Sequence, residues 1–289
     1  MQRRAFRSMG TDVEVLLDGV NEVDAPAAFS WAQGEFERLE ALFSRFRDDS
    51  ELSRLNADGE IDASPDMLAV VSAALRARER TGGRFDPTVH DALVAAGYDR
   101  TFELVARRTV RAGASPGHAG GAARIEDGRI ELAPGVRLDL GGIVKGYAAD
   151  CVAAELSTIA ACLVNAGGDV AVRGVPSLGA WGVAVETPDG SMTLALVAGG
   201  LATSGADRRR WRTEAGERHH LIDPRTGRSA DSDVLRVTAA AGSAVEAEIL
   251  AKAFFLAGER AGAAEADALG VPAVFVTRDR RVRMTGGLS

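Results

Sequence analysis

The order in which strand-like and helix-like segments follow one another constrains the fold of this chain more than any other feature. Short runs that alternate between apolar and polar residues, or stay apolar, predict strands, and apolar residues at helical spacing predict helices. The strand-like runs come in groups, with helices interspersed, at 11–17, 123–125, 129–132, 163–173, 181–186, 192–197, 234–241 and 273–277. This order predicts an α+β fold rather than a regularly wound βαβ sheet.

Helices are predicted over 24–47, 64–81, 145–160 and 244–256. The second has the clearest boundaries, because Ser64 is a suitable N-cap, Pro65 fits the first helical position and Gly82-Gly83 follow the last turn. In contrast, the Gly-, Ala-, Ser- and Pro-rich stretch 108–121 predicts a loop. Two glycines, Gly167-Gly168, fall inside the 163–173 strand, where glycine is typical of a bulge or a close approach of the backbone.

The charge balance excludes one large class of proteins. The 289 residues include 34 Lys and Arg against 41 Asp and Glu, a formal net charge of −7. Proteins that bind the nucleic-acid backbone normally carry a basic excess, so no nucleic-acid partner is expected. A local basic pocket for a phosphorylated small molecule is still compatible with this balance.

Cysteine usage and the apolar runs bear on the compartment. Cys151 and Cys162 lie in apolar runs without CxxC spacing, which predicts buried thiols rather than a redox or zinc site. No apolar run reaches the roughly 18–20 residues of a membrane span, and residues 1–12 hold neither an apolar signal region nor a lipid-anchor cysteine. We therefore expect a soluble, cytoplasmic protein with no stable membrane insertion.

Two glycine-rich segments are candidates for ligand binding. In 81–88, backbone amides and Asp86 are suited to a polar ring or a ribose, although a helix stop followed by a loop explains the same residues. In 139–147, a predicted strand ends at Gly141-Gly142 and a helix begins near Lys145, and helix N-terminal amides with a lysine favour phosphate. The segment matches neither the P-loop nor the dinucleotide fingerprint, and a tight strand–helix turn with a solvated lysine is the alternative.

The segment 220–227 pairs His220 with Asp223, next to Arg225. Such a group is suited to acid–base chemistry, although a strand end that runs into a turn has the same composition.

Taken together and in this order, these segments resemble the ApbE-type FAD:protein FMN transferases. The resemblance covers the chain nearly end to end, at 9–11, 50–56, 83–88, 139–150, 164–169, 203–205, 220–227 and 244–258. Each segment alone is a weak signal, but eight of them in register are specific.

The resemblance implies a compact, T-fold-like, two-lobed single domain over residues 1–289, with a flavin cleft. It implies an enzyme that splits the pyrophosphate of FAD with Mg²⁺ and transfers FMN to a Ser or Thr hydroxyl of an acceptor flavoprotein, leaving AMP. Some members of the family hydrolyse FAD to FMN and AMP instead. An FAD pyrophosphatase is therefore one alternative, and the altered metal site at Glu248 and Lys252 adds a second, an FAD-binding protein without turnover.

The resemblance also assigns site residues. Predicted FAD contacts are Met9 and Phe46 for the flavin, Arg84, Phe85 and Asp86 in the first glycine-rich segment, Asp139 and Lys145 in the second, and Ile222 and Ala251 as close approaches to the cofactor. His220 matches a histidine beside the reacting phosphate, as a base or as a donor that orients the phosphate.

The metal site departs from the family pattern. Relatives use a backbone-linked position that matches Gly142, followed by an Asp and a Thr one helical turn apart, where this chain has Glu248 and Lys252. Glu is able to ligate Mg²⁺, which demands near-octahedral geometry, but an ammonium cannot ligate a cation. Two interpretations follow: either Glu248 and Lys252 form an ordinary i,i+4 pair, or Lys252 replaces the metal and neutralises the pyrophosphate of FAD.

Overall fold

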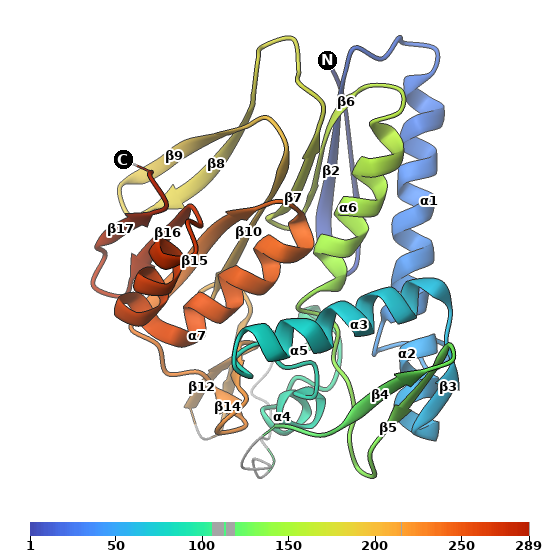
Figure 1. Ribbon diagram of the computed structural model, residues 1–289, viewed down its shortest axis with the longest axis vertical. Helices are drawn as coiled ribbons and strands as arrows, with labels where there is room; N and C mark the ends of the chain where they lie inside the picture. Colours follow the sequence, from blue (N-terminus) through green and yellow to red (C-terminus); the bar gives the residue numbers. More distant parts are fainter. Residues whose placement is uncertain (106–112, 114–118, 215, 289) are drawn as a thin grey trace. The chain divides into compact units, whose positions relative to one another are not determined.

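The computed structural model describes residues 1–105, 113, 119–214 and 216–288 (Figure 1). Its helices and strands confirm the predicted α+β class. The chain divides into two compact units. Unit 1 comprises Met1–Glu40, Ile143–Ser204 and Asp233–Ser289, and unit 2 comprises Ala41–Gly142 and Gly205–Ser232. In the described ranges no helix is both long and apolar enough to cross a membrane.

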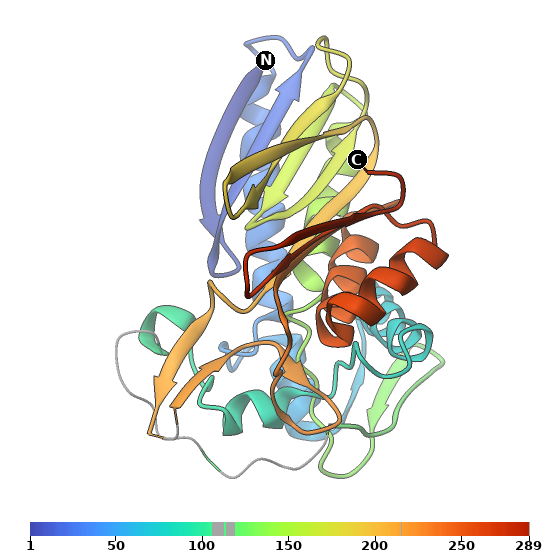
Figure 2. The same ribbon diagram turned by 90° about the vertical axis from the view of Figure 1, so that its left-hand side faces the viewer.

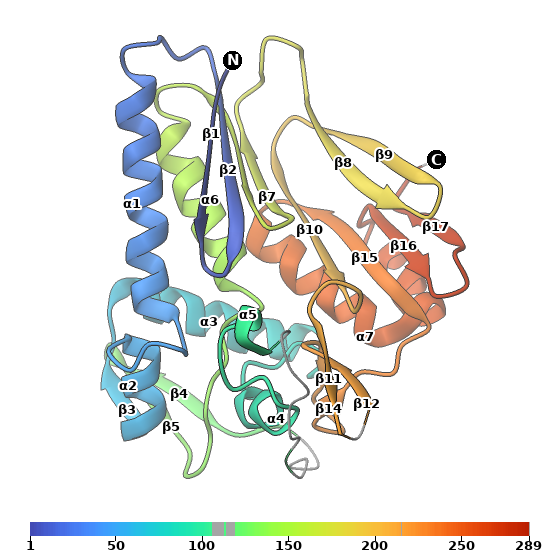
Figure 3. The same ribbon diagram turned by 180° about the vertical axis from the view of Figure 1, so that it is seen from behind.

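Unit 1 is built on an eight-stranded sheet with the order β1-β2-β6-β7-β10-β15-β16-β17. These strands are β1 (Gln2–Ser8), β2 (Thr11–Asp18), β6 (Ala161–Ala166), β7 (Asp169–Arg173), β10 (Gly199–Gly205), β15 (Val234–Ala241), β16 (Ala273–Thr277) and β17 (Val282–Thr285). One face is covered by the helices α6 (Val144–Leu156) and α7 (Ala244–Ala268), with α1 (Ala25–Phe43) beside α6 (Figures 1 and 3).

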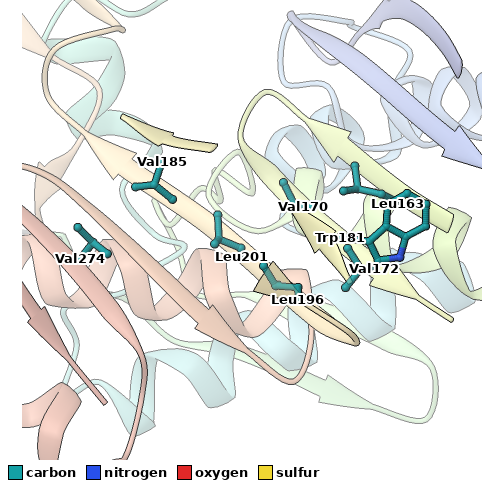
Figure 4. Packing of buried hydrophobic residues seen from close by; sticks show 8 residues of the cluster. All are labelled: Leu163, Val170, Val172, Trp181, Val185, Leu196, Leu201 and Val274. Carbon is teal, nitrogen blue, oxygen red and sulfur yellow. The ribbon is translucent and has the colours of Figure 1, made fainter. Parts of the chain in front are cut away.

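The opposite face of this sheet carries the hairpin of β8 (Trp181–Thr187) and β9 (Gly190–Leu196) (Figure 2). Side chains that alternate along a strand point to opposite faces. Accordingly, Leu163 of β6 and Val172 of β7 point toward the hairpin and pack against Trp181 (Figure 4). Unit 1 therefore has apolar residues on both faces of its sheet, which explains the nearly continuous apolar runs in β6 and β7.

The prediction of one interrupted strand over 163–173 is wrong. The segment forms two antiparallel strands, β6 and β7, and Ala166 pairs with Asp169 across a two-residue turn. That turn is Gly167-Gly168, with φ of 67° and 103°. Both glycines are needed because the turn requires left-handed backbone at both positions, a conformation that side chains disfavour. The reversal places Asp169 at the start of β7.

Several other helix and strand boundaries differ from the predicted ones for local reasons. α1 ends at Phe43 instead of 47, and α6 ends at Leu156, where the hydroxyls of Ser157 and Thr158 bond to backbone carbonyls of the last turn. α7 continues past Gly258, which has φ of 81° and kinks the helix. Residues 136–140 pair with no strand, so the strand predicted before Gly141-Gly142 is absent. β1 was not predicted, because three arginines obscure its alternation.

In the part that the structure describes, unit 2 contains four short to medium helices and small sheets. The helices are α2 (Glu51–Asp58), α3 (Pro65–Arg80), α4 (His90–Ala95) and α5 (Phe102–Val105). The strands are β3 (Glu60–Asp62), β4 (Ala123–Glu126), β5 (Arg129–Leu132), β11 (Arg210–Thr213), β12 (Gly216–His219), β13 (Ile222–Asp223) and β14 (Arg228–Ser229). The predicted 123–132 hairpin is confirmed, and most of the predicted 108–121 loop lies outside the described residues.

The predicted boundaries of α3 are confirmed. Ser64 Oγ accepts from the Met67 N–H at 3.2 Å, and Pro65 occupies the first helical position. The helix is closed by Gly83, whose N–H donates to the Arg78 carbonyl at 2.8 Å with φ of 79°. Local capping signals were sufficient here because the helix begins and ends with residues that satisfy its own terminal groups.

Candidate functional site

Lys145, Asp169 and Glu248 form a buried charged cluster in unit 1. Lys145 lies in the first turn of α6, Asp169 begins β7 and Glu248 lies in the second turn of α7. The Lys145 ammonium donates to Asp169 and, at 2.8 Å, to Glu248 Oε1. The two acidic side chains are only 3% and 5% exposed. One ammonium thus faces two buried carboxylates, and the trio carries one excess negative charge.

Glu248 also bonds to the backbone at the start of α6. Its Oε2 accepts from the Gly146 N–H at 3.0 Å. The N-cap residue Ile143 offers no side-chain cap, so the Glu248 carboxylate is the anion that the helix N-terminus favours. One backbone N–H at this helix start is thus bonded to a carboxylate of the protein itself, and phosphate binding there stays a prediction.

These residues do not fit a Mg²⁺ site. Both oxygens of Glu248 already accept hydrogen bonds, one of them from a cation. Lys252 follows one helical turn later on the same face of α7, and its ammonium cannot ligate a metal. Gly142 lies in the turn before α6. Among the described residues no group of three or more His, Cys, Asp or Glu side chains is arranged to hold a metal ion.

Lys145 and Lys252 are also the only lysines in the chain. The sequence has 34 basic residues, and counting them gives 32 arginines and these two lysines. Arginine and lysine differ chemically, because the guanidinium is a planar fork and the ammonium is a compact point charge. Both lysines lie near Glu248 in the structure or in the sequence: Lys145 is part of the charged cluster, and Lys252 follows Glu248 by one helical turn.

The charged cluster is fixed by the close approach of α6 and α7. A Cβ at Gly146 would lie 2.8 Å from the Ala244 carbonyl group, so glycine is required there. Asp150 of α6 accepts from the backbone N–H groups of Ala244 at 3.0 Å and Val245 at 2.9 Å. Burial raises the pKa of Asp150. Gly146 and Asp150 thus join α6, which carries Lys145, to α7, which carries Glu248.

The remaining predicted residues of unit 1 lie on α7 and on the first hairpin. Met9 occupies the turn between β1 and β2 with φ of 52°, and its N–H donates to Glu40 Oε2 at 2.9 Å. Ala251 is completely buried in α7, and Lys252 is partly exposed. The role of these residues in FAD binding stays a prediction.

In unit 2, a buried ion pair joins Arg45 to Asp139. Arg45 Nε lies 2.8 Å from Asp139 Oδ2, and the side chains are 8% and 10% exposed. Arg45 also donates to the Tyr98 carbonyl at 2.7 Å, and Asp139 accepts from the Gly141 N–H at 2.9 Å. Asp139 was predicted from the sequence, but its cationic partner was not.

The guanidinium of Arg45 lies over two aromatic rings. It is 4.2 Å from the ring centre of Phe46 and 4.6 Å from that of Tyr98, and Tyr98 lies 5.3 Å from Trp211. We call Arg45, Phe46, Tyr98 and Trp211 the aromatic cluster. Phe46 is 38% exposed, whereas Tyr98 and Trp211 are buried. A partly exposed ring supported by a cation and by buried rings is a suitable surface on which a planar ligand stacks.

The aromatic cluster continues into the core of unit 2. Ile222 packs with Tyr98 and Trp211, and the Trp211 indole donates to the Ala96 carbonyl at 2.8 Å. Burial raises the pKa of the Tyr98 phenol, so its hydroxyl keeps its proton at neutral pH. Arg45, Tyr98 and Trp211 were not predicted from the sequence. The one signal available for Arg45 was its position next to Phe46.

The segment after α3 has a clear structural role. Asp86 Oδ1 accepts from the Thr88 N–H at 2.8 Å and from its hydroxyl at 2.7 Å, and Oδ2 lies 3.1 Å from Arg78 Nε. Phe85 is buried and Arg84 is partly exposed. The helix stop and loop are confirmed, and the predicted contacts of Arg84, Phe85 and Asp86 with FAD stay predictions.

His220 lies directly after β12. Its N–H donates to the Arg209 carbonyl at 3.3 Å, and its Nδ1 lies 3.4 Å from the same oxygen. A carbonyl only accepts, so this contact places the ring proton on Nδ1 and the lone pair on Nε2. The neighbouring His219 has a different role, since its Nε2 lies 2.9 Å from the Ala230 carbonyl. Asp223 pairs with Arg225 at 2.8 Å, which lowers the pKa of Asp223.

The predicted site residues therefore fall into two groups. Unit 1 holds Met9, Lys145, Glu248, Ala251 and Lys252, and unit 2 holds Phe46, Arg84, Phe85, Asp86, Asp139, Gly142, His220 and Ile222. Within unit 1 the structure bonds Lys145 to Glu248. Within unit 2 it links Phe46 and Asp139 through Arg45, and Ile222 through Tyr98.

Comparison with known proteins identifies the relatives of this chain. The model of the ApbE family matches residues 9–275. An FAD:protein FMN transferase from Treponema pallidum is 33% identical over 288 residues, covering 87% of this chain and 77% of the relative. The crystal structure of the ApbE protein from Thermotoga maritima superposes with a TM-score of 0.85 at 26% identity, over 98% of this chain and 96% of that one. The flavin transferase ApbE from Vibrio cholerae gives a TM-score of 0.77 at 26% identity, over 98% and 97%.

Proposed function

This chain belongs to the ApbE family, and from that membership we propose that it is an FAD:protein FMN transferase. The observation that carries the proposal is the extent of the match, which spans nearly the whole chain and includes a relative named for this activity at 33% identity. The substrate is FAD, and the second substrate is an acceptor flavoprotein with a Ser or Thr hydroxyl.

The aromatic cluster supports the flavin part of this proposal. Phe46 offers a partly exposed ring, and the guanidinium of Arg45 lies over that ring. The isoalloxazine of FAD is a planar aromatic system, which stacks favourably on such a ring. The ion pair between Arg45 and Asp139 keeps the guanidinium in place, so the stacking surface exists before the ligand binds.

The proposed reaction replaces the phosphoanhydride bond between FMN and AMP with a phosphate ester bond between FMN and the acceptor hydroxyl. The acceptor hydroxyl oxygen attacks the FMN-side phosphorus of the pyrophosphate, a new P–O bond forms, and the bond from that phosphorus to the bridging oxygen breaks. AMP leaves with the bridging oxygen. The hydroxyl proton passes to His220 Nε2, the nitrogen that bears the lone pair, and is later released to water.

We further propose that Lys252, and not Mg²⁺, balances the negative charge at the pyrophosphate. Two ammonium groups and the two buried carboxylates of Asp169 and Glu248 cancel, so the charged cluster together with Lys252 is neutral. Without Lys252 it would carry excess negative charge, which would oppose an anionic ligand. No step of the proposed reaction passes through a metal.

One experiment separates this function from its alternatives. Purified protein is incubated with FAD and a flavin-depleted extract of the source organism, and the proteins are then separated under denaturing conditions. A fluorescent acceptor band that carries FMN on Ser or Thr, with an equal amount of AMP, supports the transferase. Free FMN and AMP without a labelled protein indicate an FAD pyrophosphatase, and bound but intact FAD indicates a protein without turnover.

A further inference from the structure

The register of the β11–β12 hairpin places Arg209 opposite His220. Arg210 pairs with His219, Trp211 with Arg218 and Thr213 with Gly216. The hydrogen bond from the His220 N–H to the Arg209 carbonyl extends this ladder by one residue at its open end. Residues directly opposite in an antiparallel pair have side chains on the same face. The side chains of Arg209 and His220 therefore share one face of the hairpin.

That face is the inner one. Trp211 and Thr213 alternate with the exposed Arg210 and Arg212, and they are only 3% and 6% exposed. Because the side-chain period is two, Arg209 shares the face of Trp211, whose ring packs on Tyr98 in the aromatic cluster. The positive charge of Arg209 acts on Tyr98 together with that of Arg45, and both lower the pKa that burial raises. Arg209 is thus close enough to the aromatic cluster for its charge to reach it.

Phosphoryl transfer requires positive charge close to the transferred phosphoryl group. In the transition state, negative charge spreads over the non-bridging oxygens of the transferred group while the nucleophile loses its proton. Guanidinium groups bind two such oxygens at once, with a geometry that an ammonium lacks. Arg209 carries such a guanidinium, on the face of the hairpin that it shares with His220.

We propose that Arg209 is a catalytic residue, whose guanidinium binds the non-bridging oxygens of the transferred phosphoryl group while His220 accepts the proton. The same residue serves the base twice, since its carbonyl fixes the imidazole tautomer and its side chain stabilises the transition state. This assignment rests on the proposed transferase function.

The test compares Arg209→Gln with Arg210→Gln. Arg210 is the matched control, because it is the next residue, lies on the outer face and forms an exposed ion pair with Glu217 at 3.6 Å. AMP release from FAD is measured with the acceptor extract described above, and FAD affinity is measured separately by flavin fluorescence. Removing a group that stabilises transition-state charge costs roughly 10²–10³ in rate. We expect that loss for Arg209→Gln, with an FAD dissociation constant raised less than about tenfold, and near-normal rates for Arg210→Gln.

Two further variants keep the result interpretable if Arg209→Gln folds poorly. Arg209→Lys should retain an intermediate rate, and millimolar guanidinium should partly restore Arg209→Ala but leave Arg210→Ala unchanged. Equal rates for Arg209→Gln and Arg210→Gln overturn the assignment, as does a loss of FAD binding with turnover at saturation intact. A wild-type protein that binds FAD but releases no AMP overturns the proposed function and this assignment with it.

Discussion

Replacing Lys252 with Thr should make FAD binding dependent on a divalent cation. In the wild type, Lys145 pairs with Asp169 and Glu248, and in the proposed function Lys252 supplies the second positive charge. In Lys252→Thr, two buried carboxylates face one ammonium, and the site gains both a net negative charge and a hydroxyl that is able to ligate a metal. The variant should therefore repel the pyrophosphate in the absence of metal and attract a cation that displaces the Lys145 ammonium from Glu248 Oε1 and restores the balance.

The magnitude follows from the loss of one charge-assisted contact. A hydrogen bond to a charged group contributes about 1.5–3 kcal/mol. At 1.4 kcal/mol for each factor of ten, Lys252→Thr should weaken FAD binding in EDTA by roughly 10- to 150-fold. Mg²⁺ should recover most of this loss, and more completely in Lys252→Thr combined with Glu248→Asp, whose shorter side chain restores the family pattern.

The assay is a titration of flavin fluorescence in EDTA and in excess Mg²⁺. Wild-type affinity should be nearly the same in both buffers. Lys252→Arg is the matched control, because it keeps the charge and should keep binding independent of metal. The reasoning is refuted if wild-type affinity collapses in EDTA while Lys252→Thr behaves like the wild type, since a metal would then supply the charge and Lys252 would lie outside the site.

Three further predictions concern the structural support and the base. Lys145→Met leaves Asp169 and Glu248 buried without their cation and should lower the free energy of unfolding by about 3–5 kcal/mol in urea denaturation. The control Arg7→Met removes an exposed ion pair with Asp12 and should cost under about 1 kcal/mol. Similar losses in the two variants would contradict the burial argument. Gly146→Ala forces a Cβ against the Ala244 backbone and should lower the free energy of unfolding by at least about 1–3 kcal/mol. The control is Gly34→Ala in α1, where a Cβ has no neighbour within 4 Å, and it should stabilise the protein by roughly 0.5–1 kcal/mol. A neutral Gly146→Ala would show that α6 and α7 separate easily. His220→Ala should lower AMP release at least about 100-fold, and a loss under about tenfold would remove His220 from the mechanism.

Sequence patterns predicted those parts of the fold that depend on local chemistry. Ser64, Pro65 and Gly83 define α3 because capping groups satisfy the helix termini within a few residues. The buried strands β15 and β16 have the predicted bounds, since continuous apolar runs are long enough to identify them. The 163–173 segment was misread because paired glycines suit both a bulge and a hairpin turn, and only the pairing of β6 with β7 decides between them.

The site was predictable only as a set of single residues. Lys145, Glu248, Asp139 and Phe46 were identified by resemblance, but not their pairing. Lys145 bonds to Glu248 and Asp169 from distant parts of the chain, and Asp139 and Phe46 share Arg45, an adjacent position without a motif. Arg209 shows the same limit more clearly. In the sequence it is one of three consecutive arginines, and only the register of β11 with β12 distinguishes it from Arg210.

Positive charge from fixed side chains differs from positive charge supplied by a metal ion. A divalent ion would supply concentrated positive charge at the phosphates, and it would attract carboxylate ligands that are not otherwise paired. Here Glu248 is paired with an ammonium and a backbone N–H, so its charge is already used within the protein. In the proposed function, fixed side chains supply positive charge instead, Lys252 for the bound pyrophosphate and Arg209 for the transferred phosphoryl group. Because such side chains are held by helix packing and strand register, their contribution survives chelation but not loss of the residue, and this difference is what the variants of Lys252 and Arg209 measure.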